Sequence, residues 1–555
     1  MKWRRAARGG VGLVLCVAGF MLARTTSYRE ITVVVNAGGC RLVTDVIDQG
    51  TDDAQGFVVL FHGLAANKKI MAYLARGLAS QNLRVFVPDL PGHGRTPGPF
   101  SFERAESCAS ALVQELSARR AIDPRRTMLA GHSMGGAIAV RVASHIGVAG
   151  VIAISPAPMR AAHGVPGDML PYNNQPPVPP HTLAMSAAFE PLGIRELTRD
   201  LIAGDSSGTG KYLFLPRATH VSVLFDQRVV HASQDWIGET LHFPVELSAP
   251  SYAPLVGSLA GLVGILLLAG PFVRETAGVQ QAATDGARPS GIEPRRGAQA
   301  AGLRGLRPFE AQGKPALQVG GEGSTVARPG VADASQNASG ALAGVSVLRA
   351  LLEVVAVSFV AVVILRFWNP LSFLRLYNGA YFASFLLILG VGLLLIHHKS
   401  VRALFPTKVN VLLLALVAGL VLHLLVTGWL DLTFTEAWLT WSRWARVPVV
   451  FVATLAYLLG EELLLGPITA QGKRARLLLA FALRLIAFLV LVFGIFVLHS
   501  GAILLVLLAF YLALFFVLQR MGMDVVRQQT DSPIAAAIFG AILLAGFCLV
   551  IFPVT

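Results

Sequence analysis

A serine lies at the centre of residues 129–136, which read L-A-G-H-S-M-G-G. The run joins a short apolar strand to a helix start rich in Gly and Ala, and it contains the pattern G-x-S-x-G. In a sharp turn between a strand and a helix, this pattern places the serine hydroxyl in solvent at a helix N-terminus. Glycines flank the serine because side chains there would clash with the strained backbone. The pattern therefore predicts that Ser133 is a nucleophile.

An earlier apolar run predicts where an oxyanion would be stabilised. Residues 57–61 are typical of a buried parallel strand, and His62 and Gly63 lie at its end. The loop after such a strand supplies one backbone N–H to an oxyanion hole, and the residue after the nucleophile supplies another. We therefore expect the N–H groups of Leu64 and Met134 to form this hole.

Three motifs together carry a family resemblance. They are H-G after the first strand, D-x-P-G-H-G at residues 89–94 after the next strand, and G-H-S-M-G-G at residues 131–136. Over residues 30–243 the chain resembles the α/β-hydrolase superfamily, in particular its lysophospholipase and monoacylglycerol-lipase-like branch. The resemblance implies a mostly parallel sheet with helices on both faces. It also implies a triad in the chain order Ser, acid, His.

The triad acid should follow the strand at residues 181–187. Members of the superfamily often read H-G-x-x-D-P here, and this chain reads S-A-A-F-E-P at residues 186–191. Glu190 therefore takes the position of the family aspartate, while Ala187 replaces a glycine. Asp205 is the alternative acid, and Asp168 comes third.

The triad base should follow the next strand, at residues 211–216. His220 comes shortly after this strand, and His231 is the alternative, within a final helix predicted over residues 222–241. His220 would take the proton of Ser133 and give it to the leaving group, while Glu190 would orient the imidazole and stabilise its cation. This chemistry requires no cofactor and no metal.

The composition sets this chain apart from soluble enzymes. Its 555 residues are 54% hydrophobic and 14% charged, and the mean hydropathy is +0.61. Such values indicate several membrane spans, so we expect the lipid bilayer as a partner. The net charge of +14 fits basic cytoplasmic loops. No basic stripe interleaved with aromatic residues is present, which excludes nucleic-acid binding.

An N-terminal anchor and eight further apolar runs are predicted as spans. Basic residues precede the apolar run at 11–23, and Arg24 follows it without an A-x-A cleavage site, which favours an uncleaved signal anchor over a signal peptide in residues 1–28. The further predicted spans are residues 255–273, 346–366, 379–398, 409–430, 447–466, 477–498, 501–518 and 533–552.

Basic residues predict the orientation of these spans. With the N-terminus inside, residues 29–243 form an exported hydrolase domain, and the basic clusters near residues 399–408, 473–476 and 520–527 fall on the cytoplasmic side. A connector and helix occupy residues 244–274. Residues 275–345 contain almost no aromatic residue and have no period, which predicts a disordered cytoplasmic loop. Residues 346–555 form an all-α transmembrane domain of seven helices.

Two glutamates within a predicted span require a partner. Glu461 and Glu462 lie at a depth similar to that of Arg484, which predicts an ion pair, with a metal or proton site as the alternative. The pair also resembles, in degenerate form, the E-E-x-x-x-R motif of CAAX-protease-like membrane proteins. Gly466 stands where that family has its arginine, and no matching histidine motif follows.

Two further features bear on compartment and access. Cys40 and Cys108 can pair in an oxidising compartment, although no spacing rule demands it. The segment from Pro156 to Pro180 is short and rich in Pro, Gly and Asn, so we expect no large lid over the site.

These features predict a membrane-anchored serine hydrolase that cleaves acyl esters, such as lipids or lysophospholipids, on the outer face of a bacterial inner membrane. Two alternatives stay open. One is a transporter or sensor bundle with an accessory or inactive hydrolase domain. The other is a peptidase, including an intramembrane protease at Glu461 and Glu462.

Overall fold

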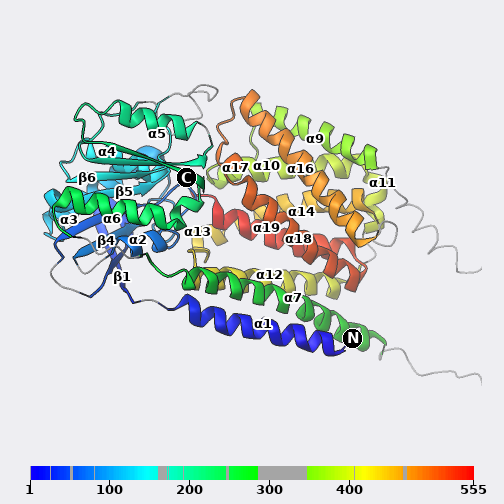
Figure 1. Ribbon diagram of the computed structural model, residues 1–555. Helices are drawn as coiled ribbons and strands as arrows, with labels where there is room; N and C mark the ends of the chain where they lie inside the picture. Colours follow the sequence, from blue (N-terminus) through cyan, green and yellow to red (C-terminus); the bar gives the residue numbers. More distant parts are fainter. Residues whose placement is uncertain are drawn as a thin grey trace, which may run out of the picture.

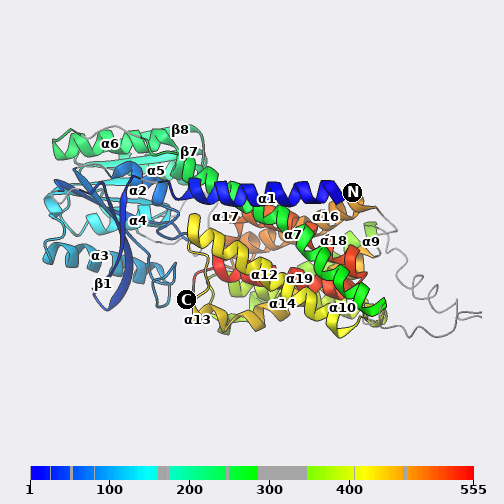
Figure 2. The ribbon, with the colours of Figure 1, turned by 90° about the horizontal axis from the view of Figure 1, so that it is seen from below.

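The computed structural model describes residues 2–25, 27–50, 54–79, 82–160, 172, 174–191, 193–244, 249–285, 347–404, 407–466 and 472–555. A domain built on a β-sheet lies at one end of a bundle of long helices (Figures 1 and 2). The N-terminus lies at the far end of the bundle, and the C-terminus lies at the junction of the two parts. Asp168 and most of the loop predicted at 275–345 lie outside the described residues.

The described part of the N-terminal domain forms an eight-stranded sheet in the order β1-β2-β4-β3-β5-β6-β7-β8. Strand β2 is antiparallel to β1 and β4, and the other neighbouring pairs are parallel. The strands are β1 (Arg29–Ala37), β2 (Cys40–Asp48), β3 (Gly56–Phe61), β4 (Leu83–Pro88), β5 (Thr127–His132), β6 (Gly150–Ile154), β7 (Thr182–Phe189) and β8 (Lys211–Thr219).

Helices cover both faces of this sheet, because its central strands are apolar on both sides. In β3, Val59 and Phe61 face a core with α3 and α4, whereas Val58 and Leu60 face a core with α2 and α6. The helices of this domain are α2 (Ala72–Leu78), α3 (Phe102–Ala118), η1 (Pro124–Arg126), α4 (Met134–Ala143), α5 (Ile194–Ala203), η3 (Ser222–Phe225) and α6 (Gln227–Leu241). The predicted mostly parallel sheet with helices on both faces is confirmed.

The final helix begins later than predicted. Residues 222–225 form the separate turn η3, and Asp226 then adopts an extended backbone before α6. The Asp226 side chain accepts a hydrogen bond from the Arg228 N–H at 2.9 Å. This N-cap fixes the start of α6 and explains the break.

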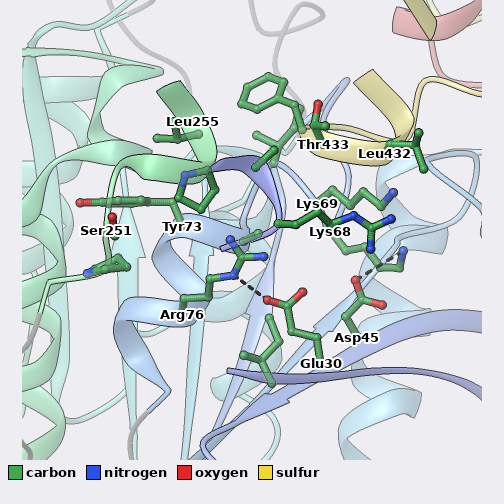
Figure 3. Close-up of a pocket in the computed structure, with 18 of the residues that line it drawn as sticks. Glu30, Asp45, Lys68, Lys69, Tyr73, Arg76, Ser251, Leu255, Leu432 and Thr433 are labelled. Atoms are coloured by element: carbon green, nitrogen blue, oxygen red, sulfur yellow. Dashed lines mark hydrogen bonds and ion pairs between the residues drawn. The ribbon is translucent and has the colours of Figure 1, made fainter. Parts of the chain in front are cut away.

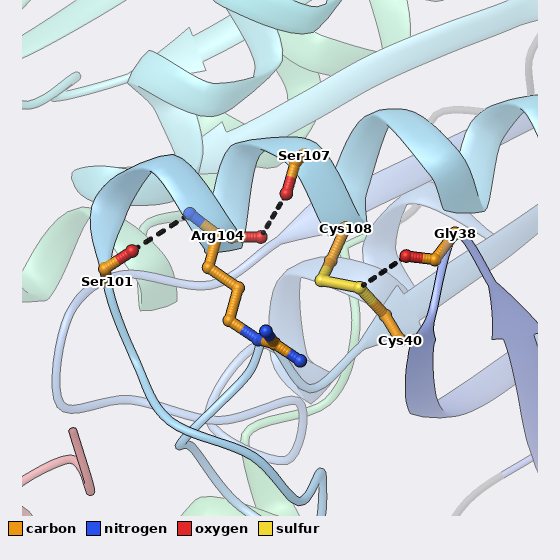
Figure 4. The surroundings of a disulfide bond; sticks show 6 residues. All are labelled: Gly38, Cys40, Ser101, Arg104, Ser107 and Cys108. Atoms are coloured by element: carbon orange, nitrogen blue, oxygen red, sulfur yellow. Dashed lines mark hydrogen bonds between the residues drawn. A yellow bond between two sulfur atoms is a disulfide. The ribbon is translucent and has the colours of Figure 1, made fainter.

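A disulfide joins Cys40 at the start of β2 to Cys108 in α3 (Figure 4). Both sulfurs are buried beneath α3, in the core between this helix and the sheet. The pairing that the sequence left open is therefore present.

Replacing both cysteines with serine should destabilise the N-terminal domain. The disulfide closes a segment with a sequence separation of 68 residues. Opening a loop of this length restores chain entropy to the unfolded state worth about 4 kcal/mol. We expect a lower unfolding midpoint for the Cys40→Ser/Cys108→Ser variant, followed by thermal unfolding of the full chain in detergent. A reductant should lower the wild-type midpoint but leave the variant unchanged.

The described helical part contains eight helices long and apolar enough to cross a membrane. They are α7 (Ala253–Asp285, apolar over Ala253–Pro271), α9 (Val347–Phe367), α10 (Gly379–Ile396), α12 (Val409–Thr433), α14 (Val447–Leu465), α16 (Lys473–Val497), α18 (Ala509–Thr530) and α19 (Pro533–Ile551). Short helices α11 (His398–Val401), α13 (Trp441–Trp444), α17 (Leu504–Leu507), η4 (Ser372–Leu374) and η5 (Arg402–Leu404) connect or flank them. Helix α7 continues to Asp285, beyond the predicted start of the loop at residue 275.

The N-terminal helix α1 (Lys2–Ala23) packs along α7 (Figure 2). Gly19 lies so close to α7 that an added Cβ would clash with the backbone at Gly257 and Gly261. Close approach through small residues is typical of helices that associate within membranes.

The predicted span at residues 501–518 is wrong at both ends. The long helix is α18, which runs through Arg520 and Arg527. A span was expected to stop before these residues because an unpaired charge is costly in a bilayer. Both arginines lie against Glu462, Arg520 at 2.7 Å and Arg527 at 3.9 Å. Since these charges have carboxylate partners, the helix can continue past them.

Glu461 and Glu462 belong to one buried network of ion pairs. Arg484 binds both carboxylate oxygens of Glu461, at 2.6 and 2.8 Å, as the predicted pair requires. Arg476 lies 2.7 Å from Glu462. The sequence analysis had assigned Arg476 to a cytoplasmic loop, but it is fully buried in α16. No group of three or more potential metal ligands occurs among the described residues.

Candidate active site

The serine lies at a strained turn between β5 and α4. Ser133 has a φ of 54° and a ψ of −118°, a conformation that costs energy in a non-glycine residue. Its N–H donates to the carbonyl of Ile154 at 2.9 Å, and its carbonyl accepts from the N–H of Ala157 at 2.9 Å. A Cβ at Gly131 would clash with the backbone of Gly135, which explains the first glycine of the motif.

Three predicted residues form a continuous chain of hydrogen bonds. His220 Nε2 lies 3.0 Å from Ser133 Oγ, and His220 Nδ1 lies 2.6 Å from Glu190 Oε2. The side chain of Glu190 is 1% exposed and that of His220 is 14% exposed. The carboxylate is therefore shielded from water, whereas the imidazole reaches the surface beside the nucleophile.

A side-chain hydroxyl and a backbone N–H hold the Glu190 carboxylate in place. Oε1 accepts hydrogen bonds from Ser155 Oγ at 2.5 Å and from the Ala187 N–H at 2.8 Å. Oε2 thereby remains available to His220. The sequence analysis missed Ser155, which follows β6, because an isolated serine after a strand carries no distinctive pattern.

The alternative acid and base lie elsewhere. The Asp205 carboxylate accepts from the N–H groups of Ser207 and Gly210, at 2.8 and 2.7 Å, and so stabilises the turn before β8. His231 lies in α6, away from the chain of hydrogen bonds that ends at Glu190.

The two predicted oxyanion donors flank the serine. Met134 is the first residue of α4, so its N–H has no acceptor within the helix. Leu64 follows Gly63, where an added Cβ would lie 3.2 Å from the Ser133 Cβ. The loop after β3 therefore passes directly beside the nucleophile, as an oxyanion hole requires.

His62 orients the peptide that carries the Leu64 N–H. Its Nε2 accepts from the Leu90 N–H at 2.9 Å, so its Nδ1 carries the proton and donates to the Gly63 carbonyl at 2.8 Å. Because a trans peptide holds its C=O and N–H on opposite sides, this bond directs the Leu64 N–H away from His62. Burial lowers the pKa of His62 to about 4, which keeps the ring neutral.

Acidification should destabilise the N-terminal domain through His62. Its pKa in the folded state lies below the ordinary value of 6.5, so the unfolded chain binds more protons between pH 6.5 and 4. Lowering the pH from 6.5 to 5 should then reduce the free energy of unfolding by about 2 kcal/mol from this group. Thermal unfolding of the full chain at several pH values measures the effect. A His62→Gln variant should show a weaker pH dependence, and an unchanged one would contradict this role.

The loops that follow β3 and β4 also contact the helical bundle. Leu64 and Ala65 pack against the hydrophobic core of the bundle. The Lys68 ammonium forms an ion pair with Glu436, which lies between α12 and α14, and lies 3.8 Å from Asp89. Burial opposes this charge, but the neighbouring carboxylates outweigh it and raise the pKa of Lys68. The loop that follows β3 and carries Leu64, here called the oxyanion loop, is thus packed against the bundle. The sequence analysis did not foresee this contact.

Comparisons with known proteins agree with this geometry. Residues 58–277 match the sequence model described as the alpha/beta hydrolase family. The N-terminal domain has the α/β-hydrolase fold. Neither the lysophospholipase-like branch nor the resemblance to CAAX-protease-like proteins gains support from the comparisons.

Curated relatives match only part of the chain. A pimeloyl-[acyl-carrier protein] methyl ester esterase from Vibrio cholerae is 32% identical over 125 residues, which are 22% of this chain and 44% of the relative. The magnesium-chelatase 30 kDa subunit of Rhodobacter capsulatus is 34% identical over 130 residues, 23% of this chain and 43% of the relative. The chain therefore spans less than half the length of these relatives.

Two solved structures are similar to less than half of this chain. An esterase from Thermogutta terrifontis is 16% identical with a TM-score of 0.30, covering 38% of this chain and 99% of the esterase. A serine hydrolase without a lid from Xanthomonas campestris is 16% identical with a TM-score of 0.31, covering 39% of this chain and 96% of the hydrolase.

Proposed function

We propose that this chain is a serine hydrolase that cleaves acyl esters through an acyl-enzyme on Ser133. The chain of hydrogen bonds from Ser133 through His220 to Glu190 carries this proposal. It places a nucleophile, a base and an orienting acid within hydrogen-bond distance of one another. An ester is favoured as the substrate because the relative from Vibrio cholerae is named as an esterase.

The reaction would proceed in two halves. His220 Nε2 takes the Ser133 proton as Oγ attacks the carbonyl carbon, and the N–H groups of Leu64 and Met134 stabilise the oxyanion. The imidazolium then protonates the leaving alkoxide as the C–O bond breaks. Water, deprotonated by His220, next attacks the acyl-enzyme and releases the acid, which restores Ser133.

We further propose that the bundle anchors this domain to the outer face of a bacterial inner membrane and that the substrate is an amphiphilic ester, such as a lysophospholipid. The Cys40–Cys108 disulfide supports an oxidising compartment. The end of α12 and the α12–α14 connection, predicted to face outward, contact the N-terminal domain through Asp431 and Glu436. Packing of Leu64 against the bundle brings the oxyanion loop close to the region where lipid would lie.

Labelling with a fluorophosphonate probe tests the nucleophile and its sidedness together. Wild-type chain in intact spheroplasts should be labelled, and Ser133→Ala should not be labelled in spheroplasts or in lysed cells. A second variant, Ser144→Ala, should be labelled as the wild type is, because the Ser144 hydroxyl at the end of α4 binds, among the described residues, only the Arg141 carbonyl. Labelling of Ser133→Ala would refute the nucleophile, and labelling of the wild type only after lysis would refute the outward orientation.

We do not extend this proposal to an intramembrane protease. Glu461 and Glu462 are both bound by arginines, so neither carboxylate is free to activate water.

A further inference from the structure

A cavity of about 330 Å³ lies at the junction of the two parts of the chain (Figure 3). This volume falls at the lower end of the range typical of small-molecule sites. Figure 3 shows Glu30, Asp45 and Arg76 of the N-terminal domain along one side and Leu255, Leu432 and Thr433 of the bundle along the other. Ser133, His220 and Glu190 are not among its lining residues.

The lining carries an excess of positive charge. It contains the four cations Arg24, Lys68, Lys69 and Arg76 but only two carboxylates, Glu30 and Asp45. Arg76 is paired with Glu30 at 2.5 Å, and Lys68 is neutralised by Asp45 at 3.5 Å and by Glu436, which is not a lining residue. The excess positive charge is therefore that of Arg24 and Lys69.

Two of these cations lack a close carboxylate partner and can therefore bind an anionic ligand. Lys69 donates to the backbone carbonyl of Asp431, and its carboxylate contact with the same residue is long, at 3.9 Å. Arg24 is exposed, its guanidinium lies over the Phe20 ring, and it has no ion pair with any described carboxylate. A ligand that binds here should therefore carry negative charge.

The cavity lies where three apolar helices end. Its lining includes the last residue of α1 (Ala23), the second and third residues of α7 (Pro254 and Leu255) and the last residue of α12 (Thr433). A helix that spans a bilayer leaves the hydrocarbon near its end, so this level corresponds to the lipid headgroups.

Neighbouring side chains fit this placement. The Trp429 indole, one turn before the end of α12, donates to the Ser258 carbonyl of α7 at 2.8 Å, and tryptophan is enriched at membrane interfaces. Val256 and Leu259 on α7 and Met21 on α1 are exposed beside the cavity. Acyl chains could lie along this apolar surface while a headgroup occupies the charged end.

We propose that this cavity binds the phosphate-bearing headgroup of an anionic phospholipid, such as phosphatidylglycerol, from the outer leaflet. The phosphate would lie between Arg24 and Lys69, and the acyl chains would run along α1 and α7. Lys68 and Lys69 belong to the loop that carries Leu64, so the bound lipid would also secure the oxyanion loop against the bundle. The site is independent of hydrolysis, and Ser133→Ala should bind the lipid as the wild type does.

Native mass spectrometry of the full chain in detergent tests this site. The probes are 1-palmitoyl-2-oleoyl phosphatidylglycerol, the matching phosphatidylcholine and free glycerol phosphate. Wild type should bind phosphatidylglycerol about 25-fold more tightly than phosphatidylcholine, since roughly fivefold is expected for each of the two cations at a membrane surface. Arg24→Gln should weaken phosphatidylglycerol binding about fivefold, Arg24→Lys should largely restore it, and Arg24→Gln/Lys69→Gln should weaken it further.

Arg125→Gln is the matched control, because Arg125 is exposed in η1, before β5, and does not line the cavity. It should leave binding unchanged. Loss of Arg24 should not reverse the orientation of the chain in the membrane. Positive charges favour the cytoplasmic side, and Arg24 is proposed to lie on the opposite side. Equal binding of the two lipids, or a full preference for phosphatidylglycerol in the double variant, would overturn the site. Displacement of the lipid by equimolar glycerol phosphate would show instead that the site takes a soluble phosphate ester.

Discussion

A Glu190→Gln variant should hydrolyse a soluble ester such as p-nitrophenyl butyrate about 10⁴-fold more slowly than the wild-type chain, through kcat rather than KM. Glu190 accepts the Nδ1–H of His220 and has its other oxygen fixed by Ser155 and Ala187. A glutamine amide in the same place can donate to Nδ1. The imidazole would then adopt the tautomer that carries its proton on Nε2, which cannot take the proton of Ser133.

Asp205→Asn is the matched control for this variant. It removes the charge of the alternative acid, which stabilises only the turn before β8. Its kcat should remain within a factor of about two of the wild-type value, since it contributes nothing to the hydrogen bonds at His220. A large loss of kcat in Asp205→Asn, with little loss in Glu190→Gln, would reverse the assignment of the acid.

A Glu462→Gln variant should lose about 3–5 kcal/mol of stability in the helical bundle. The Glu462 carboxylate lies 2.7 Å from both Arg476 and Arg520, and all three side chains are buried. Neutralising it leaves these cations with too little negative charge around them, and a buried unpaired charge is more costly than a missing pair. The unfolding midpoint of detergent-solubilised chain should fall by many degrees.

Glu353→Gln provides a comparison within the same bundle. Glu353 pairs with His397 and with the exposed Arg349 near the start of α9, so its loss should cost about 1 kcal/mol. Esterase activity per folded molecule should be unchanged in both variants. A Glu462→Gln chain with wild-type stability but no activity would contradict a structural role for this network and revive a catalytic one.

The arrangement of the candidate site was predictable because the position of each residue is encoded locally. Ser133 and Met134 lie in one turn, Leu64 follows its strand within three residues, and Glu190 and His220 each follow one strand of a parallel sheet. Since the carboxyl ends of parallel strands share one edge of a sheet, such residues meet without any further information. The exact support of Glu190 by Ser155 was not predictable, because it depends on how β6 and β7 are aligned.

Contacts between the two parts of the chain left no signal in the sequence. Lys68 and Glu436 are 368 residues apart, and each resembles an ordinary surface charge. The end of the seventh span was mispredicted for the same reason. Arg520 looks like a membrane boundary until Glu461 and Glu462 on another helix are known to face it.

Val554, which follows α19, contacts two loop residues of the N-terminal domain. The Phe100 N–H donates to the Val554 carbonyl at 2.7 Å, and the Val554 N–H donates to the Gly92 carbonyl at 3.3 Å. At ordinary translation rates residue 554 is made roughly tens of seconds after residue 100, so this particular contact can form only after the other helices have been synthesised. The contact therefore depends on the placement of α19, which ends at Ile551. A chain in which α19 is out of place would leave the loops at Gly92 and Phe100 without this partner.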